Sequence, residues 1–89
     1  MVSEYRVVFS RHARRDAKKL ARSHLKESAE KLIEMLRVDP LQSPPPYEAL
    51  KGDLEGCHSR RINIQHRLVY EVFEDKKTVL VLRMWTHYE

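Results

Sequence analysis

The spacing of hydrophobic and polar residues predicts most of the secondary structure of this chain. The clearest run lies at 67–72, where Leu68, Tyr70 and Val72 occupy every second position. A period of two residues is typical of a strand with one buried face. Further strands are predicted over 5–9, 57–62 and 78–88, with a tight reversal within 63–66 and a turn at 74–77. The strand at 67–72 extends to 73, and residues 79–82 are apolar on both faces, as expected of a strand between neighbours and under a helix.

A helical spacing of apolar residues appears between the first two of these strands. Alanine and leucine residues within 13–21 recur at the three- and four-residue intervals that share one helix face. Ser10 stands where a side-chain oxygen can cap the helix N-terminus. A second apolar stripe within 25–36 ends before Pro40, because proline disfavours helical geometry in the residue before it. The two helices are expected to form an antiparallel hairpin.

All four prolines lie within 40–46, directly after the second predicted helix. This segment has few backbone donors and cannot join a helix or a central strand. It leads as a stiff connection to 47–51. The two glycines, Gly52 and Gly56, then indicate turns before the next strand.

This order of elements predicts an α+β domain. Two N-terminal helices should pack on one face of a small, mainly antiparallel four-stranded sheet, and 1–89 should form a single domain. No segment approaches the ~20 apolar residues of a membrane span, and the N-terminus lacks the layout of a secretory signal. Cys57 is the only cysteine, which excludes an internal disulfide and a site built on several thiolates. We therefore expect a cytoplasmic protein with no membrane partner.

The charge of the chain favours anionic partners such as nucleic acid. The formal net charge is +4, from 17 lysine and arginine residues against 13 acidic residues. The bias is strongest within 11–26, where Asp16 is the only acid. The basic residues there are Arg11, Arg14, Arg15, Lys18, Lys19, Arg22 and Lys26.

Three segments that are distant in the sequence could meet on the open face of the sheet. They contain Glu48, then Arg61 and Arg67, and finally His87-Tyr88. A carboxylate, guanidinium groups, an imidazole and a phenol together suit cleavage of RNA by its own 2′-hydroxyl, which requires no metal. Each residue also has an ordinary interpretation: a solvated loop acid, an exposed strand arginine in an ion pair, and a frayed tail. Composition does not decide between these interpretations.

A resemblance favours the chemical interpretation. The chain resembles the YoeB (Txe) branch of the RelE-type toxins over nearly its whole length, in its order of elements and in several motifs. These motifs are Leu50-Lys51-Gly52-Asp53-Leu54-Glu55-Gly56, Ser59-Arg60-Arg61-Ile62, His66-Arg67-Leu68-Val69-Tyr70 and His87-Tyr88. The resemblance implies a RelE-like fold and a toxin that cleaves mRNA in the ribosomal A site.

The resemblance also implies roles for individual residues. By position, Glu48 matches the general base and Arg67 the arginine that stabilises the phosphate. His87 matches the general acid, and Tyr88 the tyrosine that orients the RNA. Supporting contacts to RNA or phosphate are expected from Lys51, Arg60, Arg61 and His66. The chain departs from the family pattern at Cys57-His58, where relatives often carry two aromatic residues, at Trp85-Thr86 and at the additional Glu89.

The resemblance implies specific partners and no cofactor or metal. It implies a YefM/Phd-type antitoxin and the bacterial ribosome with its mRNA and rRNA. Operator DNA would be contacted only indirectly, through the antitoxin, and a homodimer is compatible with the family. The basic segment 11–26 would face ribosomal RNA, where neutralisation of phosphates dominates affinity.

Two other functions are alternatives to the enzyme, and the first of them needs only the basic scaffold. A binding module without catalysis could inhibit DNA gyrase or serve as a co-repressor with an antitoxin. Such a module has no need for Glu48 together with His87-Tyr88, so these residues favour the enzyme. A metal-dependent nuclease is disfavoured because the acidic residues are scattered along the sequence.

Overall fold

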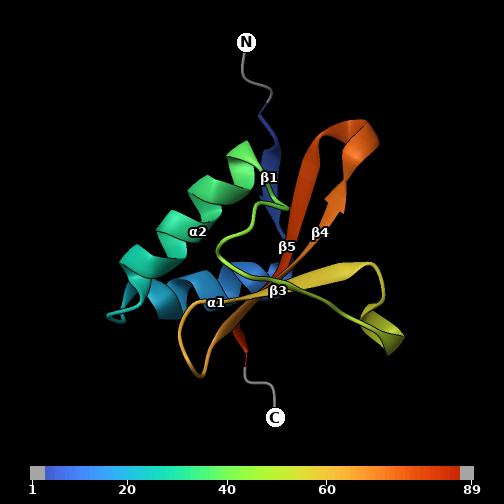
Figure 1. Cartoon of the computed structure of the whole chain (residues 1–89). Coiled ribbons are helices and arrows are strands. Elements are labelled where there is room, and N and C mark those ends of the chain that lie inside the picture. Colours follow the sequence, from blue (N-terminus) through green and yellow to red (C-terminus); the bar gives the residue numbers. More distant parts are fainter. Residues whose placement is uncertain (1–3, 87–89) are drawn as a thin grey trace.

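The structure is a computed structural model and describes residues 4–86. Two α-helices follow the first strand, and the remaining strands are joined by short connections and two turns of 3₁₀ helix (Figure 1). The elements are β1 (Arg6–Phe9), α1 (Arg11–Ala21), α2 (Lys26–Val38), β2 (Glu48–Ala49), η1 (Gly52–Leu54), β3 (Cys57–Arg61), β4 (Arg67–Phe73), η2 (Glu74–Lys76) and β5 (Thr78–Thr86).

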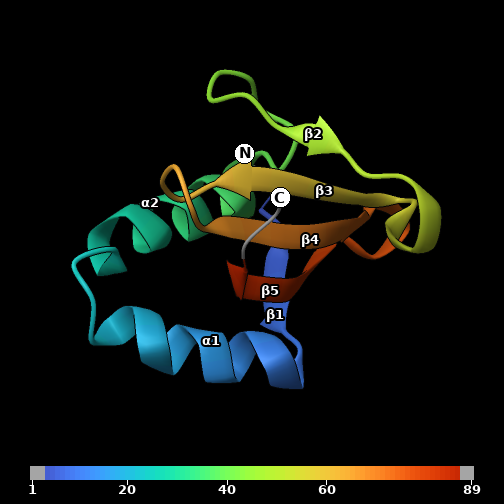
Figure 2. The ribbon, with the colours of Figure 1, turned by 90° about the horizontal axis from the view of Figure 1, so that it is seen from below.

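The strands of residues 4–86 form one sheet in the order β1-β5-β4-β3-β2. Within this described part, β1 and β5 are the only parallel neighbours. Figure 2 shows this order from one edge to the other. In Figure 1, β3 runs across the view and β5 runs upward, so the sheet is strongly twisted. The α+β class and the mainly antiparallel sheet are confirmed. The sheet has five strands rather than four, because the two residues of β2 pair with β3. A strand of two residues is too short for a period of two to be visible in the sequence.

Both helices begin and end close to the predicted positions. The Oγ of Ser10 accepts a hydrogen bond from the backbone N–H of Ala13 at 3.0 Å, which confirms the N-cap of α1. The same hydroxyl donates to the carbonyl of Leu82 at 2.8 Å and so joins the start of α1 to β5. Figures 1 and 2 show the two helices diverging from their connection at 22–25. Among the described residues, no helix is long and apolar enough to cross a membrane.

The core lies between the helices and one face of the sheet. The side chains of Leu68, Tyr70, Val79 and Val81 point to this side and are fully buried. They meet apolar residues of the helices, including Ala13, Leu20, Ala29 and Leu36. The apolar residues at 68, 70 and 72 therefore lie on the sheet face that packs against the helices. The opposite face of β3 and β4 carries Arg61 and Arg67.

Asp16, the lone acid among the basic residues of α1, is buried and holds α1 against β5. Its side chain accepts hydrogen bonds from the backbone N–H of Met84 at 2.9 Å and from Nε of Arg83 at 3.3 Å. The pairing of β5 with β4 shifts register at this point, between the pairs Tyr70↔Val81 and Val69↔Arg83. Asp16 thus accepts a hydrogen bond from the backbone N–H of Met84 where the register of β4 and β5 shifts. The lysine and arginine side chains within 11–26 all remain exposed.

Replacing Asp16 with alanine is expected to lower the free energy of unfolding by about 1–3 kcal/mol. The reason is that the backbone N–H of Met84 would be left buried without its acceptor. Urea unfolding at neutral pH measures this change. Glu34→Ala is the matched control, because Glu34 forms an exposed ion pair with Arg37 on α2 and should cost only about 0.2–0.5 kcal/mol. Equal losses in the two variants would contradict the role given to Asp16.

Candidate active site on the open sheet face

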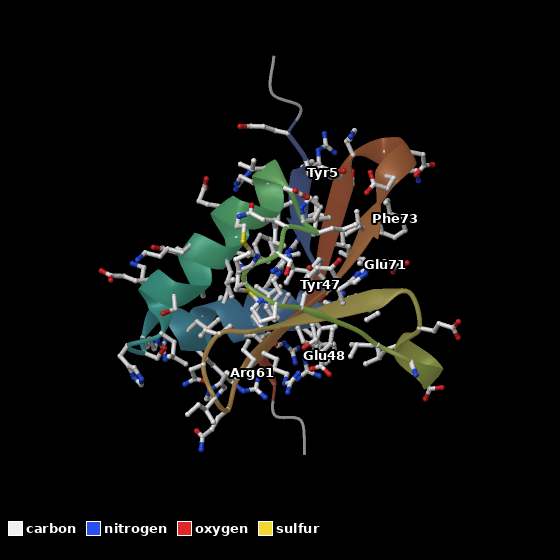
Figure 3. The ribbon with its side chains drawn as sticks, in the orientation of Figure 1. Tyr5, Tyr47, Glu48, Arg61, Glu71 and Phe73 are labelled. Atoms are coloured by element: carbon white, nitrogen blue, oxygen red, sulfur yellow. The ribbon has the colours of Figure 1, made fainter. Side chains whose placement is uncertain are left out.

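Strand register brings the predicted polar residues together on the open face of the sheet. Glu48 on β2 lies opposite Ser59 on β3, and Arg61 on β3 lies opposite Arg67 on β4. Because strands are about 4.8 Å apart and side chains alternate between faces, these four side chains share one face. Figure 3 shows Glu48 and Arg61 on the same lower side of the molecule. The two arginines would repel each other across the sheet, and the nearby Glu48 offsets that repulsion.

Glu48 and Arg67 form an ion pair at the centre of this site. Nη1 of Arg67 donates to Oε1 of Glu48 at 2.5 Å and lies 3.5 Å from Oγ of Ser59. The side chain of Arg67 is 17% exposed, whereas that of Glu48 is 66% exposed. Arg67 is therefore held against the sheet, and the carboxylate reaches it from the solvent side. The structure brings together two residues that lie 19 positions apart in the sequence.

The ion pair lines a hollow of about 280 Å³ between the proline segment and the sheet. Its charged lining contains Glu48 together with Arg60, Arg61 and Arg67. The other lining residues are Leu32, Pro45, Pro46, Tyr47 and Ser59. Guanidinium groups in excess over carboxylates, fixed on a rigid sheet, make a preorganised site for an anion such as phosphate.

The pKa of Glu48 is lowered by its surroundings. The hydrogen bond and charge of Arg67 are the main causes, and the charge of Arg61 adds to them. Both arginines favour the ionised carboxylate over the neutral acid. Glu48 is therefore a carboxylate throughout the neutral pH range, which is the form that can accept a proton.

The structure describes two of the other predicted site residues, Arg61 and Lys51, near the ion pair. Arg61 is exposed on the same face, and Lys51 is exposed at the start of η1, outside the lining of the hollow. His87 and Tyr88 lie outside the described residues. The last described residue of β5, Thr86, pairs with Arg67 on β4. The described end of the chain therefore lies at the site.

Two of the predicted RNA contacts, Arg60 and His66, are buried in the structure. Arg60 is 1% exposed and points to the opposite face of β3 from Arg61, where its N–H groups donate to Tyr70 and to three carbonyls of the proline segment. His66 is 7% exposed. Its backbone N–H donates to Oδ1 of Asn63 at 2.7 Å, and its ring nitrogen Nδ1 lies 3.3 Å from the same oxygen. Arg60 lines the hollow, but its donors are occupied by Tyr70 and the proline segment. The burial of Arg60 and His66 favours a role in packing the sheet and its 62–66 loop, and their contact with RNA stays a prediction.

Sequence reasoning missed Ser59 and Tyr47. Ser59 is buried beside Arg67, and its only sequence signal is its place in the motif before the paired arginines. The ring of Tyr47, next to Glu48, packs edge-on against His58 at 5.4 Å. Tyr47 is half-buried, and its label lies near the middle of the view in Figure 3. Tyr47, the residue before Glu48, is thus packed against His58 of β3.

The ring of His58 packs against Tyr47 and also against Tyr70. Its ring lies 5.6 Å from that of Tyr70 in a stacked arrangement, and its Nδ1 is buried without a hydrogen-bond partner among the described residues. Burial, and then the nearby guanidinium of Arg60, lower the pKa of His58. The neutral ring is therefore the form that fits the fold.

Replacing His58 with phenylalanine is expected to flatten the dependence of stability on pH below neutrality. The lowered pKa means that His58 supports the fold fully above its unfolded pKa of about 6.5, and that this support is lost as the pH falls through its folded value. Phenylalanine has no proton to gain and no buried ring nitrogen. Urea unfolding at several pH values from about 7.5 to about 5 measures the effect. His24→Phe, at an exposed position between the helices, should retain the wild-type pH dependence. A His58→Phe profile that still parallels the wild type would contradict this prediction.

Comparisons with known proteins agree with the fold. A family model described as a YoeB-like toxin of a bacterial type II toxin-antitoxin system matches residues 9–88. The toxin YoeB of Streptomyces coelicolor is 36% identical over 80 residues, which cover 88% of this chain and 95% of the relative. Among solved structures, a YoeB/ParE toxin from Agrobacterium tumefaciens superimposes with a TM-score of 0.84 at 29% identity, covering 93% of this chain and 99% of the other. A YoeB-YefM complex from Staphylococcus aureus gives a TM-score of 0.78 at 30% identity, covering 94% and 98%.

Proposed function

Because the chain belongs to the family of YoeB-like toxins of bacterial type II toxin–antitoxin systems, we propose that it is a ribosome-dependent mRNA endoribonuclease. In this proposal one toxin domain, acting in the cytoplasm, cleaves translated mRNA in the ribosomal A site. The observation that carries the proposal is the pairing of Glu48 with Arg67 on one basic sheet face. A proton acceptor and a phosphate-binding group are thereby fixed side by side.

The reaction that suits this pair is transesterification within the RNA. The Glu48 carboxylate takes the proton of a 2′-hydroxyl, whose oxygen attacks the adjacent phosphorus. The bond from phosphorus to the 5′-oxygen of the next nucleotide breaks, and His87 donates a proton to that oxygen. The products are a 2′,3′-cyclic phosphate and a free 5′-hydroxyl. Arg67 stabilises the charge that develops on the phosphate oxygens, and Tyr88 orients the RNA. The step uses acid–base catalysis without a metal ion.

The ion pair also suggests how the base becomes active when substrate binds. In the free protein Arg67 donates to the Glu48 carboxylate and lowers its pKa. A phosphate that binds Arg67 competes for the same guanidinium donors. As Glu48 loses that hydrogen bond, its pKa rises and it becomes a stronger base next to the bound nucleotide. In the free protein the Glu48 carboxylate and the Arg67 guanidinium are thus bound to each other. A bound RNA phosphate takes the place of the carboxylate at Arg67.

The proposed partners follow from charge and from the relatives. The exposed basic side chains of α1 suit ribosomal RNA, with Arg61 and Lys51 as further phosphate contacts near the site. A related toxin from Staphylococcus aureus is solved as a complex with YefM, and we propose an antitoxin of this type here. An acidic segment of it would cover the basic hollow and block Arg67, and operator DNA would be contacted through the antitoxin. A homodimer belongs to the same proposal, and analytical ultracentrifugation would detect it.

A purified translation reaction on a defined mRNA tests the proposed function, with primer extension locating any cut. Cleavage within the translated region that depends on both ribosomes and the wild-type protein would support the endoribonuclease. Intact mRNA with a demonstrably folded protein would overturn the proposal. It would favour the binding module, and a DNA gyrase supercoiling assay would then be the next measurement.

A further inference from the structure

Arg60 is the largest fully buried side chain of the described residues, although it carries a charge. Its Nη1 donates to the carbonyl of Pro45 at 2.6 Å, and its Nη2 donates to the carbonyls of Pro40 at 3.0 Å and Gln42 at 2.6 Å. Its Nε donates to the hydroxyl of Tyr70 at 3.0 Å. Among the described residues no carboxylate forms an ion pair with Arg60. Burying a guanidinium is costly unless its donors are satisfied, and here carbonyls and a phenol satisfy them.

The partners of Arg60 belong to the segment that leads to Glu48. Four prolines leave the 40–46 segment with carbonyl acceptors but few N–H donors, so it cannot hold itself to the sheet by a strand ladder. Arg60 supplies the missing donors from β3. The hydroxyl of Tyr70 adds a second link, because it also donates to the carbonyl of Pro40 at 2.7 Å.

Arg60 also contacts the residue before Glu48. Its guanidinium carbon lies 4.8 Å from the centre of the Tyr47 ring, a cation–π contact. Beyond Tyr47, the two residues of β2 pair with β3 at the edge of the sheet, and the backbone N–H of Leu50 donates to the carbonyl of Cys57 at 2.9 Å. So short a strand pairing holds its residues weakly, and the reach of Glu48 toward Arg67 depends on the segment before it.

We propose that Arg60 is the positioning residue of the active site, which fixes the proline segment and Tyr47 so that the Glu48 carboxylate meets Arg67. Its part in cleavage rests on the proposed function. Its part in placing Glu48 against Arg67 does not rest on that function, because the contact between Glu48 and Arg67 exists in the free protein.

The pKa of Glu48 in the free protein reports this geometry directly. Arg67 and Arg61 lower that pKa, and Arg60 is not among its causes. Arg60→Lys keeps the buried charge but loses the planar set of donors that reaches three carbonyls and Tyr70. The Glu48 pKa, followed by carbon NMR of the carboxyl group, is expected to rise toward the usual value of a glutamate. In an Arg67→Gln background the same substitution should produce a smaller further rise, because only the charge of Arg61 still lowers the pKa, and a double-mutant cycle measures the difference. Arg37→Lys, on the exposed side of α2, is the control and should leave the pKa unchanged.

Cleavage adds a second readout. For Arg60→Lys, kcat is expected to fall about 10- to 100-fold with little change in KM for the ribosome, because the base is misplaced while the basic surface is intact. If Arg60→Lys does not fold, Tyr70→Phe takes its place, since it removes only the hydroxyl shared by Arg60 and Pro40.

The two proposals fail in distinguishable ways. A folded Arg60→Lys or Tyr70→Phe protein with the wild-type Glu48 pKa would overturn the positioning role, whether or not the wild type cleaves mRNA. A raised Glu48 pKa in the variant would support the positioning role even if the wild type left mRNA intact, a result that would overturn only the proposed function.

Discussion

Replacing His87 with glutamine is expected to slow cleavage of ribosome-bound mRNA about 10²- to 10⁴-fold, the usual contribution of a positioned general acid. Glutamine is close in size to histidine but cannot give up a proton at neutral pH, so the 5′-oxygen would leave as an unstabilised alkoxide. Ribosome binding should be retained, because the basic residues of α1 and the sheet face are unchanged. Single-turnover primer extension at saturating ribosome concentration measures the loss in the chemical step.

The matched control for His87→Gln is His24→Gln. His24 is exposed in the connection between α1 and α2, and its replacement should leave the cleavage rate within about twofold of the wild type, as for an exposed surface position. Wild-type cleavage by the His87→Gln protein would remove the general-acid role from this residue. Loss of ribosome binding in that variant would show that His87 acts in recognition instead.

Replacing Arg67 with glutamine should be the second large effect, a loss of about 10²- to 10³-fold in cleavage rate. This is the range seen when one preorganised donor to a developing oxyanion is removed. Arg67 is the guanidinium held against the sheet in the hollow, with its donors turned to Glu48 in the free protein. Arg67→Lys keeps the charge without the planar fork and should recover only part of the rate.

The Arg67→Gln substitution should also change the pKa of Glu48 in the absence of any RNA. Without the Arg67 hydrogen bond and charge, the pKa of Glu48 is expected to rise toward its usual value. Carbon NMR of the carboxyl group across an acid titration measures the shift. Arg37→Gln, which breaks the exposed ion pair on α2, is the control for both readouts. An unchanged Glu48 pKa in Arg67→Gln would show that the ion pair is absent in solution.

The local elements of this fold could be predicted because their signals are local. The period of two residues predicted β4 to the residue, Arg67–Phe73, and the Ser10 cap placed the start of α1 correctly. The proline segment correctly ended the second helix at Val38. The strand β2 could not be predicted in the same way, because its two residues are fixed by their pairing with β3 and by the segment before them.

The candidate site shows the same limit at Arg60 and Arg61. Adjacent residues of a strand point to opposite faces, so only one of this pair can lie on the open face. The family resemblance implied phosphate contacts for both, and a buried arginine is unfavourable unless acceptors surround it. Those acceptors are carbonyls that lie 15 to 20 residues earlier in the chain. Arg60 could therefore be assigned only once the path of the proline segment was known.

The ends of the cleaved mRNA test the central claim most directly. Fragments from the purified translation reaction can be labelled at their 5′ ends with and without prior phosphatase treatment, and their 3′ ends can be tested for a cyclic phosphate. The account predicts free 5′-hydroxyl ends, 2′,3′-cyclic phosphates, and no cut where the nucleotide that supplies the 2′-hydroxyl is replaced by its 2′-deoxy form. Fragments with 5′-phosphates and 3′-hydroxyls, or cleavage that persists at the 2′-deoxy nucleotide, would contradict the chemistry assigned to Glu48, Arg67 and His87.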